Sequence, residues 1–373
     1  MNRPDYEHAR QQAGFRWSVG ATQAALRELA GIPIKQFNLN PDACIEAYRR
    51  GQPMLDEMFP EVVAPVPLAT PAVSYGHVNG LGSELIFPEG GEVAHAHIYS
   101  SLEEGIAALK EPVDFATAGM APFFLDFLEK LQAAFPGQKV GFSYGLEGPI
   151  TTAWELRGEG FFTDIFDQPE RTKEFLGLVV DSIAEFHRFR CRVSGTEPIN
   201  PNGAGMCDDI ASNIPPYLFS EMVVPAWDGF YRAMTTGRRR AHVEDLRPAQ
   251  LPYLEEVGLS YFDPSISHRL NPRIIWDCCR VPFGWRLGSF HYLSMSADDV
   301  RDFVFQAAAD GACAVFTYIE GLLVHEPQRS KVYAFIEAAQ EVEQALDEGA
   351  TRADLAAMVS DAGKAKFWDH WLE

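Results

Sequence analysis

Residues Ser296–Tyr318 read SADDVRDFVFQAAADGACAVFTY, a helical pattern followed closely by a strand-like run. The opening letters SADD are typical of a helix start, and apolar residues then recur at helical spacing from Val300 to Ala307. Ala314–Tyr318 is short, apolar and β-prone, as in a buried strand. A helix that leads directly into a strand is the repeating unit of a parallel α/β sheet.

The same alternation extends through most of the chain. Further β-prone runs, separated by helical patterns, are Val140–Tyr144, Ile199–Gly203, His242–Glu244, Ser260–Phe262 and Gly284–Ser289. Strand-helix units in this number favour a parallel sheet, and closure into a single (β/α)8 TIM barrel is the expected arrangement. We assign residues 1–50 to an N-terminal helical extension and residues 51–373 to the barrel. No repeat, low-complexity tract or linker divides the chain.

Composition narrows the classes of function. The chain has 373 residues, 47% of them hydrophobic, which is enough for a large core. Its formal net charge of −21 at pH 7 disfavours nucleic acid and acidic membrane surfaces as partners. The start is polar, no run approaches a membrane span, and the six cysteines form no CxxC pair. We therefore expect a cytoplasmic protein with reduced thiols, and the sequence leaves a homodimer open.

In a parallel barrel, chemistry takes place at the carboxyl ends of the strands. Polar residues near the predicted strand ends are therefore the candidates for a site. They are Tyr144, Asp208, Asp209, His242, Glu244, Asp263, His291, Tyr318 and Glu320.

Within this set, His242 and Glu244 are separated by one residue. Residues i and i+2 of a strand point to the same face, so the imidazole and the carboxylate should lie together. Such a pair can be a hydrogen-bonded couple without metal, or two ligands of a metal ion. The residues alone leave both readings open.

Several segments together resemble the uroporphyrinogen decarboxylase superfamily, which includes zinc-dependent, corrinoid-linked methyltransferases. These segments are LGSELIFPEGG with IYSSLEEGIAALKEP, GLEGPITTAWELRG, DQPERTKEFLGLV, DDIASNIPPYLFSEMVVPAWDGFY, and HVED followed by LPYLEEVGLSYFDP. Their order and spacing resemble the superfamily from about residue 50 to residue 340. The resemblance implies a (β/α)8 barrel.

The chain departs from the pattern of true decarboxylases. The segment Arg10–Arg16, RQQAGFR, resembles the arginine-rich RQAGR motif of the decarboxylases but lies too far upstream. Pro67, in EVVAPVPL, stands about where the resemblance places an aspartate at the end of the first strand. The late turn, TYIEG, lacks the expected histidine. A metal-independent lyase of the decarboxylase type is therefore the alternative function, and it would need cationic residues such as Arg157 or Arg286 in the cavity.

The methyltransferase branch carries His-x-Cys where this chain has His242-Val243-Glu244, and a further cysteine near Glu320. The resemblance thus implies a zinc site in which glutamates replace both cysteines, held by His242, Glu244 and Glu320, with Asp263 in reserve. Zinc accepts carboxylate oxygen as well as thiolate, and a harder ligand set suits activation of an ether or alcohol oxygen. The Asp-x-His-x-x-Gly cobalt-ligand motif is absent from the sequence, so the corrinoid would be carried by a partner protein.

The remaining candidates have two readings each. One of Asp208 and Asp209 could be catalytic as a proton donor or acceptor, or could cap the helix ahead of Ile210. Tyr144, Trp154 and Tyr318 are the predicted substrate-binding residues, although Tyr144 and Trp154 could equally belong to the core.

From these residues the sequence predicts an O-demethylase type of methyltransferase that moves the methyl group of a small methoxy donor to the corrinoid. A non-catalytic barrel that binds a small molecule is the third reading. A buried, mutually satisfied pair of His242 and Glu244 would favour it.

Overall fold

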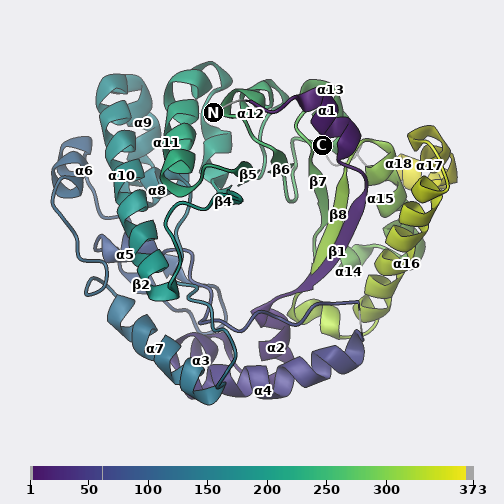
Figure 1. The fold of residues 1–373 in the computed structure, drawn as a ribbon, viewed down its shortest axis with the longest axis horizontal. Coiled ribbons are helices and arrows are strands. Elements are labelled where there is room, and N and C mark those ends of the chain that lie inside the picture. Colours follow the sequence, from purple (N-terminus) through teal and green to yellow (C-terminus); the bar gives the residue numbers. More distant parts are fainter. Residues whose placement is uncertain (1–2, 61, 367–373) are drawn as a thin grey trace. The chain divides into compact units, whose positions relative to one another are not determined.

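The computed structural model describes residues 3–60 and 62–366 (Figure 1). The chain divides into two compact units, which are described separately. The first unit contains Gly31–Arg49 and Pro67–Arg239. The second contains, among the described residues, 3–30, 50–60, 62–66 and 240–366. No helix of the described residues has the length and apolar character that crossing a membrane requires.

The first unit is mainly helical. Its elements are α3 (Ile34–Leu39), the start of α4 (Pro41–Met58), α5 (Gly76–Gly80), β2 (Leu85–Ile86), β3 (Ala94–His95), α6 (Leu102–Leu109), α7 (Ala121–Ala134), α8 (Pro149–Arg157), α9 (Gly160–Asp167), α10 (Pro169–Ser194), β4 (Gly203–Cys207), α11 (Val224–Met234) and the first residues of β5 (Arg238–His242). Short parallel bridges join Ala69 to Gly141 and Val73 to Tyr144. Parallel pairing therefore occurs here outside the regular strands as well.

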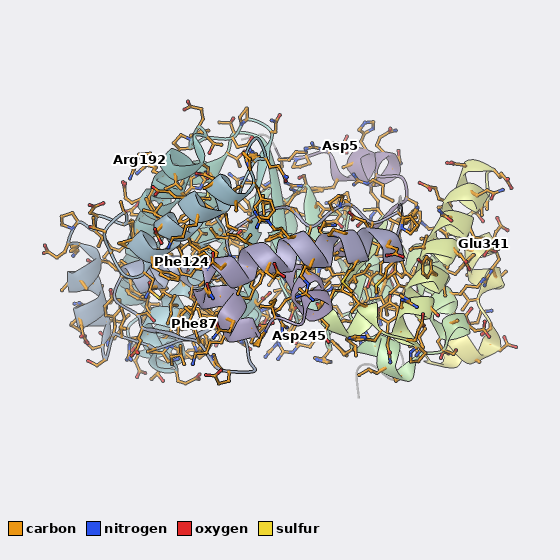
Figure 2. The ribbon with its side chains drawn as sticks, turned by 90° about the horizontal axis from the view of Figure 1, so that it is seen from below. Asp5, Phe87, Phe124, Arg192, Asp245 and Glu341 are labelled. Atoms are coloured by element: carbon orange, nitrogen blue, oxygen red, sulfur yellow. The ribbon has the colours of Figure 1, made fainter. Side chains whose placement is uncertain are left out.

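An aromatic cluster lies in the core of the first unit. Phe124 of α7, labelled in Figure 2, stacks on Tyr144 with ring centroids 5.0 Å apart. Phe186 and Phe189 of α10 pack against the same cluster. The helical spacing that the sequence shows between residues 175 and 186 is the buried face of α10.

The second unit carries a parallel sheet. Its elements are α1 (Tyr6–Gln12), β1 (Arg16–Ala21), α2 (Gln23–Ala30), the end of α4, the end of β5, α12 (Pro252–Val257), β6 (Tyr261–Asp263), α13 (Pro272–Cys278), β7 (Gly284–Leu287), α14 (His291–Ser294), α15 (Ala297–Ala309), β8 (Ala314–Ile319), α16 (Gln328–Asp347), α17 (Arg352–Met358) and α18 (Asp361–Lys366). The strands lie in the order β5, β6, β7, β8, β1, and a bridge from Phe262 to Phe283 links β6 to β7. Helices join the successive strands from β5 to β8, as the sequence predicts.

The two faces of this sheet differ. Alternation along the strands places buried apolar residues on one face, among them Val19, Phe262, Trp285 and Val315. The opposite face carries polar residues that keep part of their surface exposed, among them Ser18, His242, Asp263, Arg286 and Tyr318. A sheet face of this kind can bind a ligand, because its polar side chains are still accessible.

The structure tests the predicted fold class and bears on the predicted N-terminal extension. The α/β class with parallel strands is confirmed, while closure into an eight-stranded barrel stays a prediction. The predicted helical extension over residues 1–50 does contain helices, but β1 also lies within it and pairs with β8. Residues 62–68, near the expected first strand, form none. In RWSVGA a glycine and a serine dilute the hydrophobic alternation, which is why the β1 pattern is weak.

Candidate functional site

His242 and Asp263 are register partners at the ends of neighbouring strands, β5 and β6. Nδ1 of His242 lies 2.9 Å from Oδ2 of Asp263, which accepts its hydrogen. Nε2 lies 3.8 Å from Oε1 of Glu244. The expected strand over His242–Glu244 is wrong, because β5 ends at His242 and Glu244 lies in the turn that follows. The side chains of His242, Asp263 and Glu244 are 27%, 21% and 41% exposed. The imidazole is therefore oriented by one carboxylate and flanked by a second at an accessible edge.

The loops that follow these two strands are conformationally unusual. Among the described residues, the non-glycine positions with positive φ are Asp245, at 57°, and Ser265, at 49°. Asp245 directly follows Glu244, and the Ser265 amide donates to Oδ1 of Asp263 at 2.7 Å. Left-handed backbone at non-glycine residues is costly and gathers at functional sites. Here it fixes the orientation of the Asp263 carboxylate.

A second cluster of polar side chains lies at the carboxyl ends of β7 and β8. Arg286 Nη2 donates to Oε1 of Glu320 at 3.0 Å, and Ser289 Oγ donates to Oε2 at 2.7 Å. Arg286 Nη1 also reaches the Ser265 hydroxyl, at 3.3 Å, so the guanidinium spans from the loop after β6 to the loop after β8. Its buried Nε has no acceptor among the described residues.

Tyr318 of β8 lies beside this cluster. The Arg286 guanidinium lies 5.1 Å from the centre of the Tyr318 ring, within the range of a cation–π interaction. The ring passes over Gly20, its register partner in β1. A Cβ at Gly20 would come within 2.9 Å of the ring, so the glycine makes room for it. Unlike a core residue, Tyr318 keeps 39% of its surface exposed.

The predicted zinc ligands are brought together only in part. His242 and Glu244 are adjacent, whereas both oxygens of Glu320 are engaged by Arg286 and Ser289. Across residues 3–60 and 62–366, no three His, Cys, Asp or Glu side chains are grouped closely enough to bind a metal ion. The donor set in this arrangement therefore does not fit the three-ligand site that the sequence suggests. Asp263, the reserve ligand, instead supports the imidazole.

The remaining predicted residues belong to the first unit. Asp208, directly after β4, is fully buried and accepts the backbone N–H groups of Thr151, at 2.6 Å, and Ile150, at 3.2 Å. It also accepts the Trp227 indole N–H at 2.6 Å. Burial raises the pKa of Asp208 to about 6, although these hydrogen bonds oppose the shift. The carboxylate thus caps the start of α8, not the turn ahead of Ile210.

Tyr144 and Trp154 also have local partners. Tyr144 is fully buried, and its hydroxyl donates to Oδ1 of Asn79, so this residue belongs to the core and not to an open cavity wall. Trp154 is half-buried, and its ring centroid lies 5.0 Å from that of His97. The indole N–H donates to Oε1 of Glu159 at 3.3 Å. Asp209 begins the 3-10 turn Asp209–Asn213 and is partly exposed.

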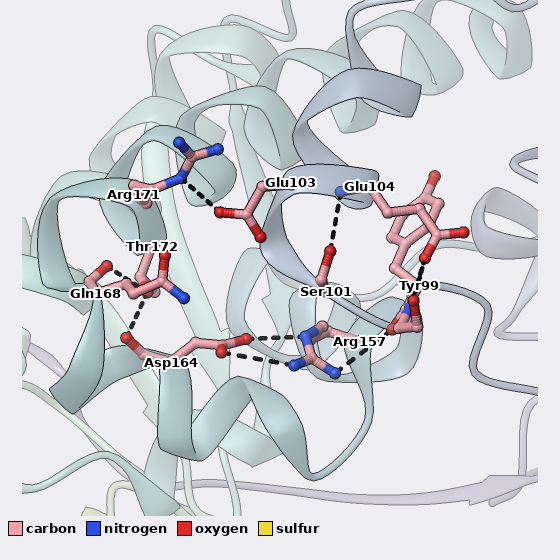
Figure 3. A network of polar contacts seen from close by, with 10 residues as sticks. Tyr99, Ser101, Glu103, Glu104, Arg157, Asp164, Gln168, Arg171 and Thr172 are labelled. Atoms are coloured by element: carbon pink, nitrogen blue, oxygen red, sulfur yellow. Dashed lines mark hydrogen bonds and ion pairs between the residues drawn. The ribbon is translucent and has the colours of Figure 1, made fainter.

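Arg157, which a lyase could have used to bind a carboxylate, is engaged in a network of the first unit (Figure 3). Its Nε donates to Oδ2 of Asp164 at 2.8 Å, and Nη1 reaches the Tyr99 carbonyl oxygen at 3.5 Å. The Asp164 carbonyl in turn accepts the Thr172 hydroxyl at 2.9 Å. The pair joins α8 to α9, so its role is structural.

Sequence reasoning missed two residues, Ser289 at the second polar cluster and the buried Glu155 of the first unit. Ser289 lies two residues beyond β7, a strand-end position that could have been noticed. Glu155 gave no such signal because it lies inside α8. It is buried, its Oε1 has no hydrogen-bond partner among the described residues, and burial raises its pKa well above the usual range. The carboxylates of Glu147 and Asp208 add to that shift.

Comparison with known proteins gives a likeness of fold. A scan against protein families finds no match, and a search of curated proteins finds none either. Among solved structures, the chain is similar to a methyltransferase from Methanosarcina mazei, with a TM-score of 0.62 and 15% sequence identity. The alignment covers 88% of this chain and 94% of that chain. The chain therefore has the fold of that methyltransferase over nearly its whole length.

Proposed function

We propose that this chain is a methyltransferase of the O-demethylase type, which moves the methyl group of a small methoxy compound to a corrinoid carried by a separate protein. The observation that carries the proposal is the oriented His242–Asp263 pair at the carboxyl edge of the parallel sheet. The likeness of fold to a methyltransferase supports it. A site at this edge is where parallel α/β folds place their chemistry.

His242 is assigned the proton transfer. The leaving oxygen of a methoxy group must receive a proton as the C–O bond breaks, because an unprotonated alkoxide is a poor leaving group. Protonated His242 would donate from Nε2 to that oxygen, while Asp263 stabilises the imidazolium through Nδ1. The reduced corrinoid, as the methyl acceptor, supplies the electron pair for the new bond to carbon. The products are then the methylated acceptor and an alcohol or phenol.

Arg286 and Tyr318 are assigned to substrate binding. A guanidinium between Ser265 and Glu320 can bind an anionic or polar group of the methoxy compound. The exposed ring of Tyr318 offers an apolar surface beside it. Together they favour a small aromatic or carboxylated methoxy substrate.

Zinc binding is an alternative to the proton transfer, because Asp263 occupies Nδ1 and a zinc ion at Nε2 would leave His242 without a proton to donate. If zinc binds, His242 and Glu244 would hold it, and Glu320 could join only by leaving Arg286 and Ser289. A bound zinc ion would act as a Lewis acid on the substrate oxygen. The hydrogen bond from Nδ1 of His242 to Asp263 is of the kind that orients metal-binding histidines, which supports testing for the metal.

A lyase that acts on a carboxylated substrate is the second candidate. Arg286 favours it, because this guanidinium lies at the same edge as His242 and its buried Nε has no acceptor among the described residues. A non-catalytic binding protein is less well supported, because His242 and Glu244 are not buried.

The test is methyl transfer from methoxy-substituted aromatic acids to free reduced cobalamin, followed by the absorbance of methylcobalamin. We expect transfer by the wild type and a loss of about 100-fold in kcat for His242→Gln and for Asp263→Asn. The matched control is His325→Gln, which breaks an exposed pair with Glu28, Nε2 to Oε1 2.9 Å, and should leave kcat unchanged. Wild-type protein without transfer to cobalamin, or His242→Gln at full activity, would contradict the proposal; release of CO2 instead would identify the lyase.

Metal content is measured independently on the same proteins. The zinc proposal predicts about one equivalent in reconstituted wild type and a large loss in Glu244→Ala. Wild type that holds well under one equivalent would remove zinc from the proposal, while the proton-transfer role of His242 would still stand on the kinetic result.

A further inference from the structure

A cavity of about 500 Å³ lies at the opposite edge of the second unit. It is lined by Glu7, Arg10, Gln11, Trp276, Arg280 and Arg352. These residues lie on α1, which leads into β1, on α13 and the turn that leads into β7, and at the start of α17. His242 and Glu320 lie at the carboxyl ends of their strands, whereas five of the six lining residues of this cavity lie on segments that precede β1 or β7, and Arg352 joins them from α17. It is therefore distinct from the candidate reaction site.

Two arginines cover the indole of Trp276 in this cavity. The guanidinium carbons of Arg10 and Arg352 lie 3.7 Å and 3.9 Å from the centre of the ring. Gly311, just before β8, makes this packing possible. A Cβ there would come within 2.4 Å of the indole and 2.9 Å of Arg352 Nη1. The indole therefore helps to hold two cationic side chains in place beside each other.

The three arginines differ in their partners. Arg280 is paired with Glu255, Nη2 to Oε2 2.7 Å. Arg10 Nη2 donates to the carbonyl oxygens of Trp276, at 3.0 Å, and of Cys279. Arg352 stacks on the indole, and no hydrogen bond joins its guanidinium to another residue within the part of the chain that the structure describes. Five N–H donors of Arg352 and the remaining donors of Arg10 are thus available to a ligand.

The electrostatics also favour an anion. Burial lowers the pKa of Arg352, and the positive charge of Arg10 lowers it further, against a smaller opposing effect of Asp310. Glu7 is the one carboxylate among the lining residues, and it is exposed. Cations that repel one another at a cavity wall are stabilised by a shared counter-ion. This arrangement stands out in a chain of net charge −21.

We propose that this cavity binds the phosphate group of a small phosphorylated ligand. The guanidinium groups come from three separate segments and so approach the cavity from different directions. A tetrahedral phosphate accepts hydrogen bonds from several directions at once, whereas the two coplanar oxygens of a carboxylate match a single guanidinium fork. Because α1, α13 and α17 would all contact the ligand, binding would also stabilise the second unit.

Calorimetric titration of the full chain with inorganic pyrophosphate tests the site, with sodium chloride as the ionic-strength control and citrate as the polycarboxylate control. We expect saturable binding to pyrophosphate, weaker binding to citrate, and a higher unfolding midpoint with pyrophosphate. Arg352→Met should weaken pyrophosphate binding about 10- to 100-fold, as loss of a charge-assisted contact does. Arg301→Met is the matched control, because Arg301 also stacks on an aromatic ring, Cζ 4.2 Å from the Phe305 centroid, but lies outside the cavity.

Gln11→Glu is a second variant, because Arg352→Met could lose pyrophosphate binding simply by destabilising the fold. Gln11 is exposed, so this substitution should leave the unfolding midpoint of the ligand-free protein unchanged while the added charge weakens pyrophosphate binding. The proposal is overturned by three results. They are no saturable binding of pyrophosphate up to about 10 mM, equal affinity in wild type and both cavity variants, or citrate binding as tight as pyrophosphate.

Discussion

Asp208 in the first unit and Asp263 in the second occupy similar places in the sequence pattern, each at the carboxyl end of a strand. Asp208 is fully buried and its oxygens accept two backbone amides and an indole. Asp263 is 21% exposed and accepts the imidazole of His242. The partner therefore distinguishes the two carboxylates: the one that caps a helix is structural, and the one that orients an accessible histidine is the one that we propose for a reaction site.

We expect the largest effect from Asp208→Ala. The substitution leaves the N–H groups of Ile150, Thr151 and Trp227 without their buried acceptor. We expect the free energy of unfolding to fall by about 3–5 kcal/mol, since each unsatisfied buried donor costs about 1–3 kcal/mol and part is offset by removal of a buried charge. Urea denaturation at pH 7 measures it.

Asp209→Ala is the control, because Asp209 is adjacent in the sequence but partly exposed. Its unfolding free energy should change by less than about 1 kcal/mol. If Asp208→Ala abolished methyl transfer while leaving the unfolding free energy unchanged, Asp208 would be a site residue and the contrast with Asp263 would be wrong.

A smaller effect appears in the pH dependence of stability. The folded pKa of Asp208, about 6, lies above the ordinary value of 3.8, because burial disfavours the charged form. The contribution of Asp208 to the free energy of unfolding is therefore fully present below pH 3.8 and is lost as pH rises through 6. Between pH 4 and pH 7, wild type should lose up to about 3 kcal/mol relative to Asp208→Asn, which cannot ionise. Unfolding curves of both proteins across this range give the difference, and parallel curves would refute the assigned shift.

The sequence predicts the local alternation of the second unit well. The helix and strand of Ser296–Tyr318 are α15 and β8, because strong helical spacing and a continuous apolar run leave little ambiguity. β1 was missed because its outward positions are Arg16, Ser18 and Gly20, which suit a polar sheet face but resemble a loop in sequence. Such a strand is recognised only from its pairing with β8.

The site was predictable where it depends on residues close in the sequence and not where it depends on contacts between strands. His242 and Glu244 are neighbours as expected, although Glu244 lies in the turn after β5 and not on the strand face that the i, i+2 rule assumes. No local rule indicates that Arg286 and Ser289 engage Glu320, or that Asp208 caps a helix that begins about 60 residues earlier. These partners are set by tertiary packing, and they decide which carboxylates are available for chemistry.

The mildest test applies one substitution to both units, because the sequence predicts Tyr144 and Tyr318 alike as substrate-binding residues. Tyr144→Phe removes a buried hydroxyl that donates to Asn79, so we expect a loss of about 1 kcal/mol in unfolding free energy and an unchanged KM for the methoxy substrate. Tyr318→Phe keeps the ring beside Arg286 and should leave stability within about 0.5 kcal/mol, since the side chain is partly exposed. Tyr318→Ala removes the ring and should raise KM several-fold, because the apolar surface beside Arg286 is lost. A rise in KM for Tyr144→Phe with none for Tyr318→Ala would place the substrate in the first unit and reverse the assignment.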